Sequence, residues 1–387
     1  MCRTGHSRKN LQWQIYIKIG CDKAVPPQNI SSHLYIIYGT FNIFSIFVLN
    51  EIIRTFSVAM NYSVKTYYRK EDLPPLEEVN FFHYASSFDW YSHCPTYTPF
   101  MLIAFEKEKP VAAMFATIVR INRLLRGSLF RRCFISQQPA FLEKDLPQIE
   151  IFNALITHLV KEVRNKVFLI RYDNLGNAIF GYKGFRNNHF YSVKWVNIRN
   201  SLQRKRKIWE QLSNSRRNQV NKAVKRGVVM EELVSEENLP EIYKLIQKTN
   251  NKKISRRFPP YAYFENFFRH YVQMGKGKIM LTRYQGKIIG GAILGFESNS
   301  TVYCLYYWGK SKRYQTLYPT IFTIYSAMNV SEENGFHYFD FMDVGFLNRN
   351  AGRSRFLLQF GGKQRATRRW YRYNWGLLNF FANKIYD

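Results

Sequence analysis

Short apolar blocks separated by polar turns predict a sheet-rich fold from Val79 onward. Two apolar runs between Phe100 and Arg120 flank the charged residues 106–109, which predicts a β-hairpin with a charged tip. A second hairpin is predicted from Ile279 to Phe296, with its turn at 285–287. Before the first hairpin, Phe81–Tyr91 is typical of a helix lead-in, and after it Leu129–Ser136 is typical of a strand.

Each hairpin is followed by a helix and then a strand, and the two helix–strand units share the same order and the same kind of ending. Pro147 opens a predicted helix that ends near Arg164, and the strand Val167–Tyr172 follows it. In the second half a helix begins after Pro319, and the strand Phe336–Met342 follows that helix. The two units end in polar turns, Asp173–Gly176 and Asp343–Gly345.

The repeated order of these elements indicates an internal duplication. Phe152 lies 24 residues before Gly176, and Phe322 lies 23 residues before Gly345. Matching hairpins and helix–strand units recur about 170 to 180 residues apart, which chance does not readily produce. Antiparallel hairpins followed by a strand–helix–strand crossover make an α/β (α+β) fold.

Residues 1–59 do not follow this plan. No Asp, Glu, Lys or Arg occurs from His33 to Asn50, which is near the minimum length for a membrane-spanning helix. Three explanations stay open: a membrane anchor, an amphipathic surface segment, or sequence upstream of a true start at Met60. We therefore expect an N-terminal extension that need not belong to the fold, followed by two domains, 60–200 and 201–387.

Composition favours an anionic partner. The formal net charge is +30, with 57 basic and 27 acidic residues, which suits a polyanionic substrate or an anionic inner-membrane face. The five cysteines are scattered without zinc-ligand spacing, so we expect reduced thiols, no metal, and a cytoplasmic location with or without membrane association.

Two segments concentrate the positive charge. From Arg199 to Arg226 there are ten basic residues and one acidic residue, on a helical pattern that Gly227 ends. Like charges four apart destabilise a helix, so this asymmetry favours anion binding over a solvated face. The tail Lys363–Trp375 alternates Arg with aromatic residues, which suits either nucleic-acid stacking or, together with 376–385, a membrane interface.

Residues 334–362 combine a buried strand, acids and glycines. Asp340 and Asp343 interrupt an apolar strand, where a carboxylate needs a partner because an unpaired buried charge is costly. Gly361 and Gly362 follow Phe360 and permit a close approach of backbone to backbone or to ligand.

A strand with Asp, then Gly, a basic loop and Phe356-x3-Phe360-Gly361-Gly362 resembles the end of the second acyltransferase-like domain of the Fem family. The resemblance covers roughly residues 75–375. It implies tandem GNAT-like domains, each a mixed sheet flanked by helices, and amide formation from aminoacyl-tRNA in peptidoglycan synthesis. Leu357 departs from the pattern, because the family usually has lysine there; a catalytic role of that lysine would be lost or moved in this chain.

The resemblance also implies site residues. It places Arg216 or Arg217 with Lys222 near the nucleotide phosphates of a substrate. It implies substrate contacts for the closing motif, at Phe356, Phe360, Gly361 and Gly362.

Acyl transfer to an amine needs a group that orients the amine and a donor to the developing oxyanion. Asp340 and Asp343 are candidates for the first role, although Asp340 also suits a purely structural buried pair. Tyr303, Tyr306 and Tyr307 could fill the second role, with Tyr306 as the catalytic candidate, and Lys310 and Arg355 could also donate. No Ser-His-Asp or Cys-His arrangement indicates a covalent acyl-enzyme.

The sequence indicates the acyl donor only indirectly, through the absence of a CoA-binding loop. A CoA-binding loop needs Gly-x-Gly/Ala at a helix N-terminus, and neither 309–320 nor 137–147 contains it. We therefore expect no cofactor, with aminoacyl-tRNA favoured over acyl-CoA as acyl donor and a cell-envelope precursor as amine acceptor. Two alternatives stay open: a CoA-dependent N-acyltransferase of polysaccharide or lipid synthesis, and a non-catalytic RNA- or membrane-surface-binding protein.

Overall fold

The computed structural model describes residues 62–121, 127–203, 206–250, 258–298, 300–310, 312–346 and 351–386. They belong to one compact unit, Ser57–Asp387. The segment His33–Asn50 and the proposed start at Met60 lie outside the described residues. No helix in the described ranges is both long enough and apolar enough to cross a membrane.

The described strands form one continuous mixed sheet of 13 strands. Twelve follow the order β1-β2-β3-β4-β6-β13-β7-β12-β11-β10-β9-β8, and β5 pairs with β3. The strands are β1 (Tyr62–Tyr67), β2 (Tyr97–Glu106), β3 (Lys109–Arg120), β4 (Arg131–Ser136), β5 (Ala140–Phe141), β6 (Leu169–Asn174), β7 (Tyr191–Ser201), β8 (Val229–Glu232), β9 (Gly277–Tyr284), β10 (Lys287–Glu297), β11 (Thr301–Gly309), β12 (Tyr338–Asp340) and β13 (Lys363–Tyr373).

Helices flank this sheet. The α-helices are α2 (Ser87–Trp90), α3 (Gln148–Val163), α4 (Tyr182–Asn187), α5 (Ile208–Gln211), α6 (Asn214–Lys225), α7 (Leu239–Asn250), α8 (Tyr261–Phe267), α9 (Pro319–Glu333), α10 (Ala351–Leu358) and α11 (Gly376–Tyr386). Short 3-10 or π segments are η1 (Phe81–His83), η2 (Ser128–Phe130), η3 (Glu236–Asn238), η4 (Phe268–Val272) and η5 (Gln315–Leu317).

The duplication is visible in the topology, and the predicted fold class is confirmed. In the first lobe β4 and β6 are parallel and α3 connects them in sequence; in the second lobe β11 and β12 are parallel and α9 connects them. Each parallel pair follows an antiparallel hairpin, β2–β3 or β9–β10. Both predicted hairpins are therefore confirmed, with their turns at the predicted charged or glycine-containing tips.

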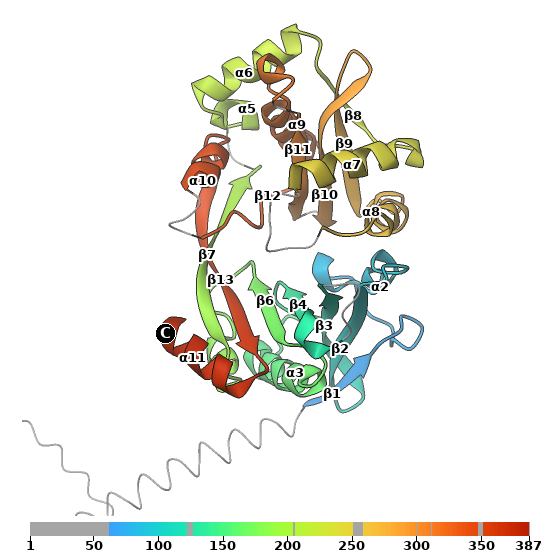
Figure 1. The fold of residues 1–387 in the computed structure, drawn as a ribbon, viewed down its shortest axis with the longest axis vertical. Coiled ribbons are helices and arrows are strands. Elements are labelled where there is room, and N and C mark those ends of the chain that lie inside the picture. The colour runs from blue at the N-terminus through green and yellow to red at the C-terminus, as the bar shows by residue number, and fades with distance from the viewer. Residues whose placement is uncertain are drawn as a thin grey trace, which may run out of the picture. The chain divides into compact units, whose positions relative to one another are not determined.

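The two lobes exchange strands at the centre of the sheet. The strand β7 follows the first lobe in sequence but pairs with β12 of the second, while β13 follows the second lobe and pairs with β6 of the first. The two strands also pair with each other and run between the lobes in Figure 1. The predicted boundary near residue 200 therefore divides the sequence but not the sheet.

Two predicted elements are shorter in the structure. The strand expected over 336–342 is regular only at Tyr338–Asp340, because the backbone turns at Met342. The lead-in expected over 81–91 contains only η1 and the four-residue α2, which begins after Ser86 as expected but without a side-chain cap.

The core of the first lobe explains why its strands are continuous apolar runs and do not alternate apolar with polar residues. Along β2, Phe100, Leu102 and Ala104 face α3 in one core, while Met101, Ile103 and Phe105 belong to a second core. A strand covered on both faces reads as a continuous apolar run. Its partner α3 buries one apolar stripe from Ile151 to Val163, as the 3.6-residue period requires.

An aromatic cluster joins the lobes. Phe81 is fully buried, with its ring centroid 5.5 Å from that of Tyr271 and 5.8 Å from that of Tyr303. Glycine at position 295 makes room for it, because a Cβ there would lie 2.3 Å from the Phe81 ring. The segment before α2 is thus held in the core of the second lobe.

Replacing Phe81 tests this joint. We expect Phe81→Ala to lower the free energy of unfolding by about 3–5 kcal/mol, because it leaves a cavity among packed rings. Urea denaturation measures the change, and Val234→Ala, at an 86% exposed side chain, is the control with an expected effect within about 0.5 kcal/mol. A loss below about 1 kcal/mol for Phe81→Ala would contradict the packing argument.

His83 fixes the same segment to the first lobe. Its Nδ1 accepts the Phe115 backbone N–H at 2.9 Å, so Nε2 carries the proton and donates to the Gln138 carbonyl at 2.7 Å. Burial lowers the pKa of His83 from 6.5 to about 4. Between these values the unfolded chain binds a proton that the folded protein does not.

Folding stability should therefore fall as the pH drops from 6.5 to 4, by up to about 3 kcal/mol from this residue. We expect His83→Gln to flatten the pH dependence of the unfolding free energy in this window, as measured by urea denaturation at a series of pH values. The exposed His337, replaced by Gln, is the control that should leave the slope unchanged. An unaltered slope in His83→Gln would show that His83 does not titrate as argued.

Candidate active site

A cavity of about 520 Å³ lies between the lobes. Strand β4 contributes Arg132, Phe134 and Ser136 from the first lobe, and β11 contributes the run 304–307 from the second. Nearly half of the described lining residues are aromatic: Phe82, Trp90, Tyr91, Tyr97, Phe115, Phe134, Phe258, Tyr263, Tyr306, Tyr307 and Phe341. Such walls suit stacking against flat or ring-shaped groups of a ligand.

A tight turn after β12 brings Asp343 to this cavity. The buried Asp340 accepts hydrogen bonds from Asn197 Nδ2 at 2.6 Å and from the Met342 backbone N–H at 2.7 Å. Arg199 Nε donates to the other oxygen at 2.8 Å. Met342 has φ +52°, a left-handed conformation that a side chain adopts only when its surroundings enforce it. Asp340 thus holds the turn that presents Asp343.

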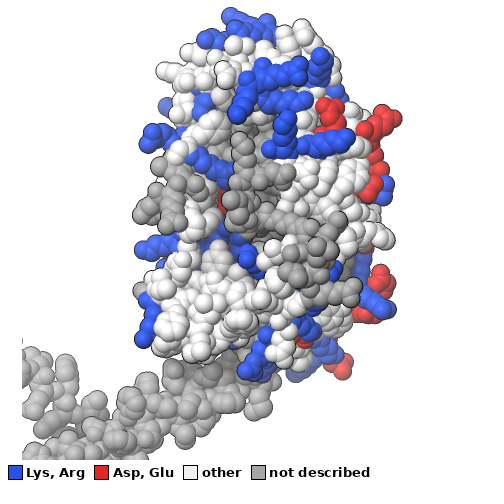
Figure 2. Space-filling view, viewed as in Figure 1, with Lys and Arg blue, Asp and Glu red and all other residues white. Residues whose placement is uncertain are grey.

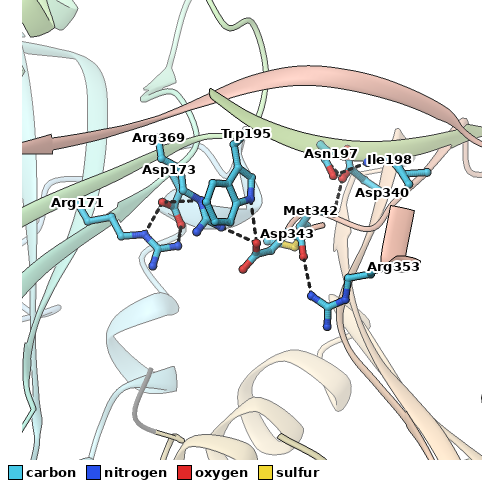
Figure 3. A network of polar contacts seen from close by, with 10 residues as sticks. All are labelled: Arg171, Asp173, Trp195, Asn197, Ile198, Asp340, Met342, Asp343, Arg353 and Arg369. Carbon is cyan, nitrogen blue, oxygen red and sulfur yellow. Dashed lines mark hydrogen bonds and ion pairs between the residues drawn. The ribbon is translucent and has the colours of Figure 1, made fainter. Parts of the chain in front are cut away.

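The Asp343 carboxylate is fixed by two donors (Figure 3). Its Oδ1 accepts from Arg369 Nη2 at 2.7 Å and from Trp195 Nε1 at 3.0 Å. The Arg369 guanidinium also stacks on the Trp195 ring, 3.6 Å from its centroid. The Asp343 side chain is still 40% exposed, so it can meet a ligand in the cavity.

The same arginine reaches the matching acid of the first lobe. Arg369 Nε lies 3.4 Å from Asp173 Oδ1, and Arg171 binds both oxygens of Asp173 at 2.7 Å. Although burial alone would lower the pKa of Arg171, the Asp173 carboxylate raises it above its usual range. Asp173 and Asp343 end the corresponding strands of the duplication, and Arg369 from β13 bridges them.

Two arginines face the cavity from opposite lobes. Arg353 of α10 donates to the Asp343 carbonyl at 3.4 Å. Burial raises the pKa of the neighbouring Tyr307, while the charge of Arg353 opposes that rise. From the first lobe, Arg132 lines the cavity with a buried Nε that has no hydrogen-bond partner in the described part of the chain. The pair suits an anionic group on a ligand.

Of the predicted catalytic residues, Asp343 and Tyr306 line the cavity together. Asp340 is fully buried and is not among the described lining residues. Burial raises the pKa of Cys304, another lining residue, so its thiol stays protonated and is a poor nucleophile.

The closing motif packs inside the protein. Arg216 is 7% exposed and stacks on Phe356 and Phe360, 4.4 and 5.5 Å from their ring centroids. A Cβ at Gly361, which has φ +88°, would lie 2.9 Å from the Gln211 carbonyl oxygen. At Gly362 it would lie 2.6 Å from Asn200 Oδ1. Both glycines therefore allow close packing between segments of this protein.

The remaining predicted cations lie away from the described cavity wall. Arg217 bonds Asn214 within α6, and Lys222 is exposed on the same helix. Lys310 lies 3.9 Å from Glu241, and Arg355 is exposed on α10. None of these four residues is among the described lining residues.

Leu357 occupies the position where the family usually has lysine. It is 1% exposed, belongs to the core of the second lobe and touches the cavity. The cation nearest to it in sequence among the described lining residues is Arg353, one turn earlier on α10.

The FemAB family model matches residues 154–283, which span α3 to β9. The fold agrees with that match over most of the chain. The crystal structure of FemX is similar with a TM-score of 0.57 and 13% identity, covering 79% of this chain and 94% of that one. Residues 154–283 thus resemble the FemAB family, and the fold resembles that of FemX over most of the chain.

A second solved structure shares the tandem arrangement. A tandem GNAT protein from the clavulanic acid biosynthesis pathway, solved without acetyl-CoA, has a TM-score of 0.53 and 8% identity, with coverage of 81% of this chain and 99% of that one. At such identities the likeness establishes the fold. No curated protein sequence matches the chain. The family match and the two solved structures thus agree on a Fem-like fold of tandem GNAT type.

Several residues of the site do not follow from the sequence pattern. Trp195, Arg369 and Arg132 lie on separate strands, and only the strand exchange and lobe contact bring them to Asp343 or the cavity. Helix periodicity could have indicated Arg353. Residues two apart on a helix, such as Arg353 and Arg355, point in nearly opposite directions, so only one of the two can face the cavity. No group of three or more His, Cys, Asp or Glu able to hold a metal occurs in the described ranges.

The Arg369 bridge can be tested by stability. We expect Arg369→Met to cost about 3–5 kcal/mol of unfolding free energy, because it leaves the buried Asp173 and the site acid Asp343 short of a cation. Arg369→Lys should recover part of the loss. Arg368→Met, on the neighbouring half-buried side chain, should cost less than about 1 kcal/mol in urea denaturation. Equal effects at 368 and 369 would refute the bridge.

Proposed function

We propose that this acyltransferase forms an amide between an aminoacyl group carried by tRNA and an amine of a cell-envelope precursor. The observation that carries the proposal is the position of Asp343, the only acid among the described residues lining the cavity. It lies on a site with arginines from both lobes and aromatic walls. A cytoplasmic location and a role in the cell wall belong to the same proposal.

Asp343 suits the acceptor amine. When an amine attacks an ester carbonyl, positive charge develops on nitrogen, and a fixed carboxylate stabilises it. Arg369 and Trp195 orient Asp343 before the reaction, which avoids reorganisation during it. The new C–N bond replaces the ester C–O bond, and the proton lost by nitrogen ends on the released ribose hydroxyl. Asp343 is placed to hold that proton in passage.

Arg353 and Tyr306 supply hydrogen-bond donors for the negative charge that develops on the carbonyl oxygen. The carbonyl oxygen becomes negative as nitrogen attacks, and donors that face it lower the barrier. Arg132 from the opposite lobe suits a phosphate or carboxylate of the precursor, since its buried Nε has no partner among the described residues. Leu357 offers no charge, so Arg353 takes the electrostatic role on α10 in this proposal.

The basic surface suits a polyanionic donor. Figure 2 shows Lys and Arg side chains gathered over the upper lobe, where α6 lies in Figure 1. Lys222, Lys225 and Arg226 are exposed at the end of α6. A surface of this kind attracts nucleic acid through its phosphates and gives a binding strength that falls with salt. The described part of the loop before α9 has no Gly-x-Gly, which disfavours CoA.

Replacing the site acid tests the proposal. With radiolabelled aminoacyl-tRNA and nucleotide- or lipid-linked muropeptide, we expect Asp343→Asn to lower kcat about 100-fold or more, because the neutral amide neither stabilises the ammonium nor takes its proton. Substrate KM should change little. The exposed Asp72, replaced by Asn, is the matched control and should keep full turnover.

Unchanged turnover in Asp343→Asn would remove Asp343 from the chemistry. Transfer from acetyl-CoA but from no aminoacyl-tRNA would favour the CoA-dependent alternative instead. Absence of transfer from either donor, with tRNA still bound, would favour the non-catalytic RNA-binding alternative.

A further inference from the structure

The C-terminal helix α11 has its polar and apolar faces reversed. Its buried residues are Asn379 and Ala382, whereas the large apolar side chains of the helix point outward. The outward set is Leu377 (79% exposed), Phe380 (53%), Phe381 (58%) and Ile385 (76%), after Trp375 (57%). A surface helix of a globular protein normally buries its apolar stripe, so this face is suited to another apolar phase.

Hydrogen bonds hold the helix in place, together with the buried Ala382 and the stacking of Tyr386 on Tyr191. Asn379 accepts the Tyr373 backbone N–H and donates to the His189 carbonyl, both at 2.9 Å. Asn383 donates to the same carbonyl at 3.3 Å and accepts from Arg186 Nη1 at 3.2 Å. These bonds fix the rotation of the helix, so the outward direction of the apolar stripe is set by the fold.

Cations border this stripe, and acids are few in the sequence around it. Residues 363–387 contain six Lys or Arg and one acid, Asp387. Lys384 Nζ lies 4.6 Å above the Phe380 ring. Burial and the nearby charge of Arg164 lower the pKa of Arg372, the last arginine before the helix. Within the described chain, none of Arg164, Arg372 and Lys384 lies within ion-pair distance of a carboxylate.

We propose that α11 docks this protein on the surface of an anionic lipid bilayer. The apolar stripe enters the boundary between head groups and acyl chains, Trp375 lies at the level of the head groups, and the bordering cations meet lipid phosphates. In Figure 2 the corner that carries α11, at the lower left, is mostly white and bordered by blue. This combination of apolar area and uncompensated positive charge matches a bilayer better than a second copy of this basic chain, whose charge would repel it.

Docking is independent of the chemistry in the cavity. The helix packs on β7 and β13, the strands that carry Trp195 and Arg369, so a bilayer-bound α11 would hold the acyltransferase site at the membrane surface. A lipid-linked acceptor would then be presented to a tethered enzyme at high local concentration. Failure of docking would leave the proposed reaction with a nucleotide-linked acceptor intact.

The test uses the full chain and vesicles of defined composition. We expect cosedimentation with phosphatidylglycerol-containing vesicles and weak binding to phosphatidylcholine alone, with a loss of binding in high salt. The double variant Leu377→Glu/Phe381→Glu should weaken partitioning about tenfold or more, because it places two anions on the docking face. The matched control, Val234→Glu/Met274→Glu, changes two exposed apolar residues elsewhere, 86% and 68% exposed, and should retain binding.

A second readout locates the contact. Brominated lipids should quench part of the tryptophan fluorescence of the native chain, and Trp375→Phe should remove that part. Circular dichroism checks that each variant keeps its fold. Unchanged vesicle binding in the α11 variant, or quenching that survives Trp375→Phe, would overturn the proposal. So would a dimer in solution that the α11 variant dissociates, because the apolar face would then be a subunit interface.

Discussion

The buried guanidinium of Arg369 is the contact on which the organisation of the site depends. It lies on β13, between strands of the first and second lobes, and it meets Asp173 from one lobe and Asp343 from the other. Without it, two acids at the ends of duplicated strands would face each other without a shared cation, at a cost of several kcal/mol. Stacking on Trp195 fixes the guanidinium plane, so the orientation of Asp343 follows from the sheet.

Strand exchange explains why a duplicated chain makes one site. Each lobe supplies a parallel strand pair, and each receives its next strand from the other half of the sequence. The cavity therefore has walls from both halves, and the equivalent turns carry different roles. Asp173 is 6% exposed and paired twice, whereas Asp343 keeps access to the cavity. Divergence of burial after duplication therefore separates an enclosed acid, Asp173, from one that faces the cavity, Asp343.

The site differs from the expected Fem-type pattern in the source of its charge. Leu357 contributes only apolar wall, while Arg353 on the same helix and Arg132 on the opposite lobe bring the positive charge. Of the expected phosphate ligands on α6, Lys222 is exposed, whereas Arg216 packs between α6 and the closing aromatic motif. A local sequence motif does not distinguish an arginine that stacks on aromatic rings in the core from one that binds a ligand. The same side chain is suited to both roles.

Local pattern determined much of this protein: both hairpins, the α3 and α9 units, the duplication and the fold class follow from periodicity, turn residues and repeat spacing. It also marked Asp340 and Asp343 as acids that need partners, since charge in an apolar strand is costly wherever it occurs. Only the tertiary structure decided which acid is a buried anchor and which faces the cavity, because Asn197 and Arg199 of β7 enclose Asp340 while Asp343 lines the cavity. It alone placed Arg369, Trp195 and Arg132 at the site, because strand exchange and the contact between the lobes bring them there. It also turned the apolar face of α11 outward, because hydrogen bonds fix the rotation of that helix.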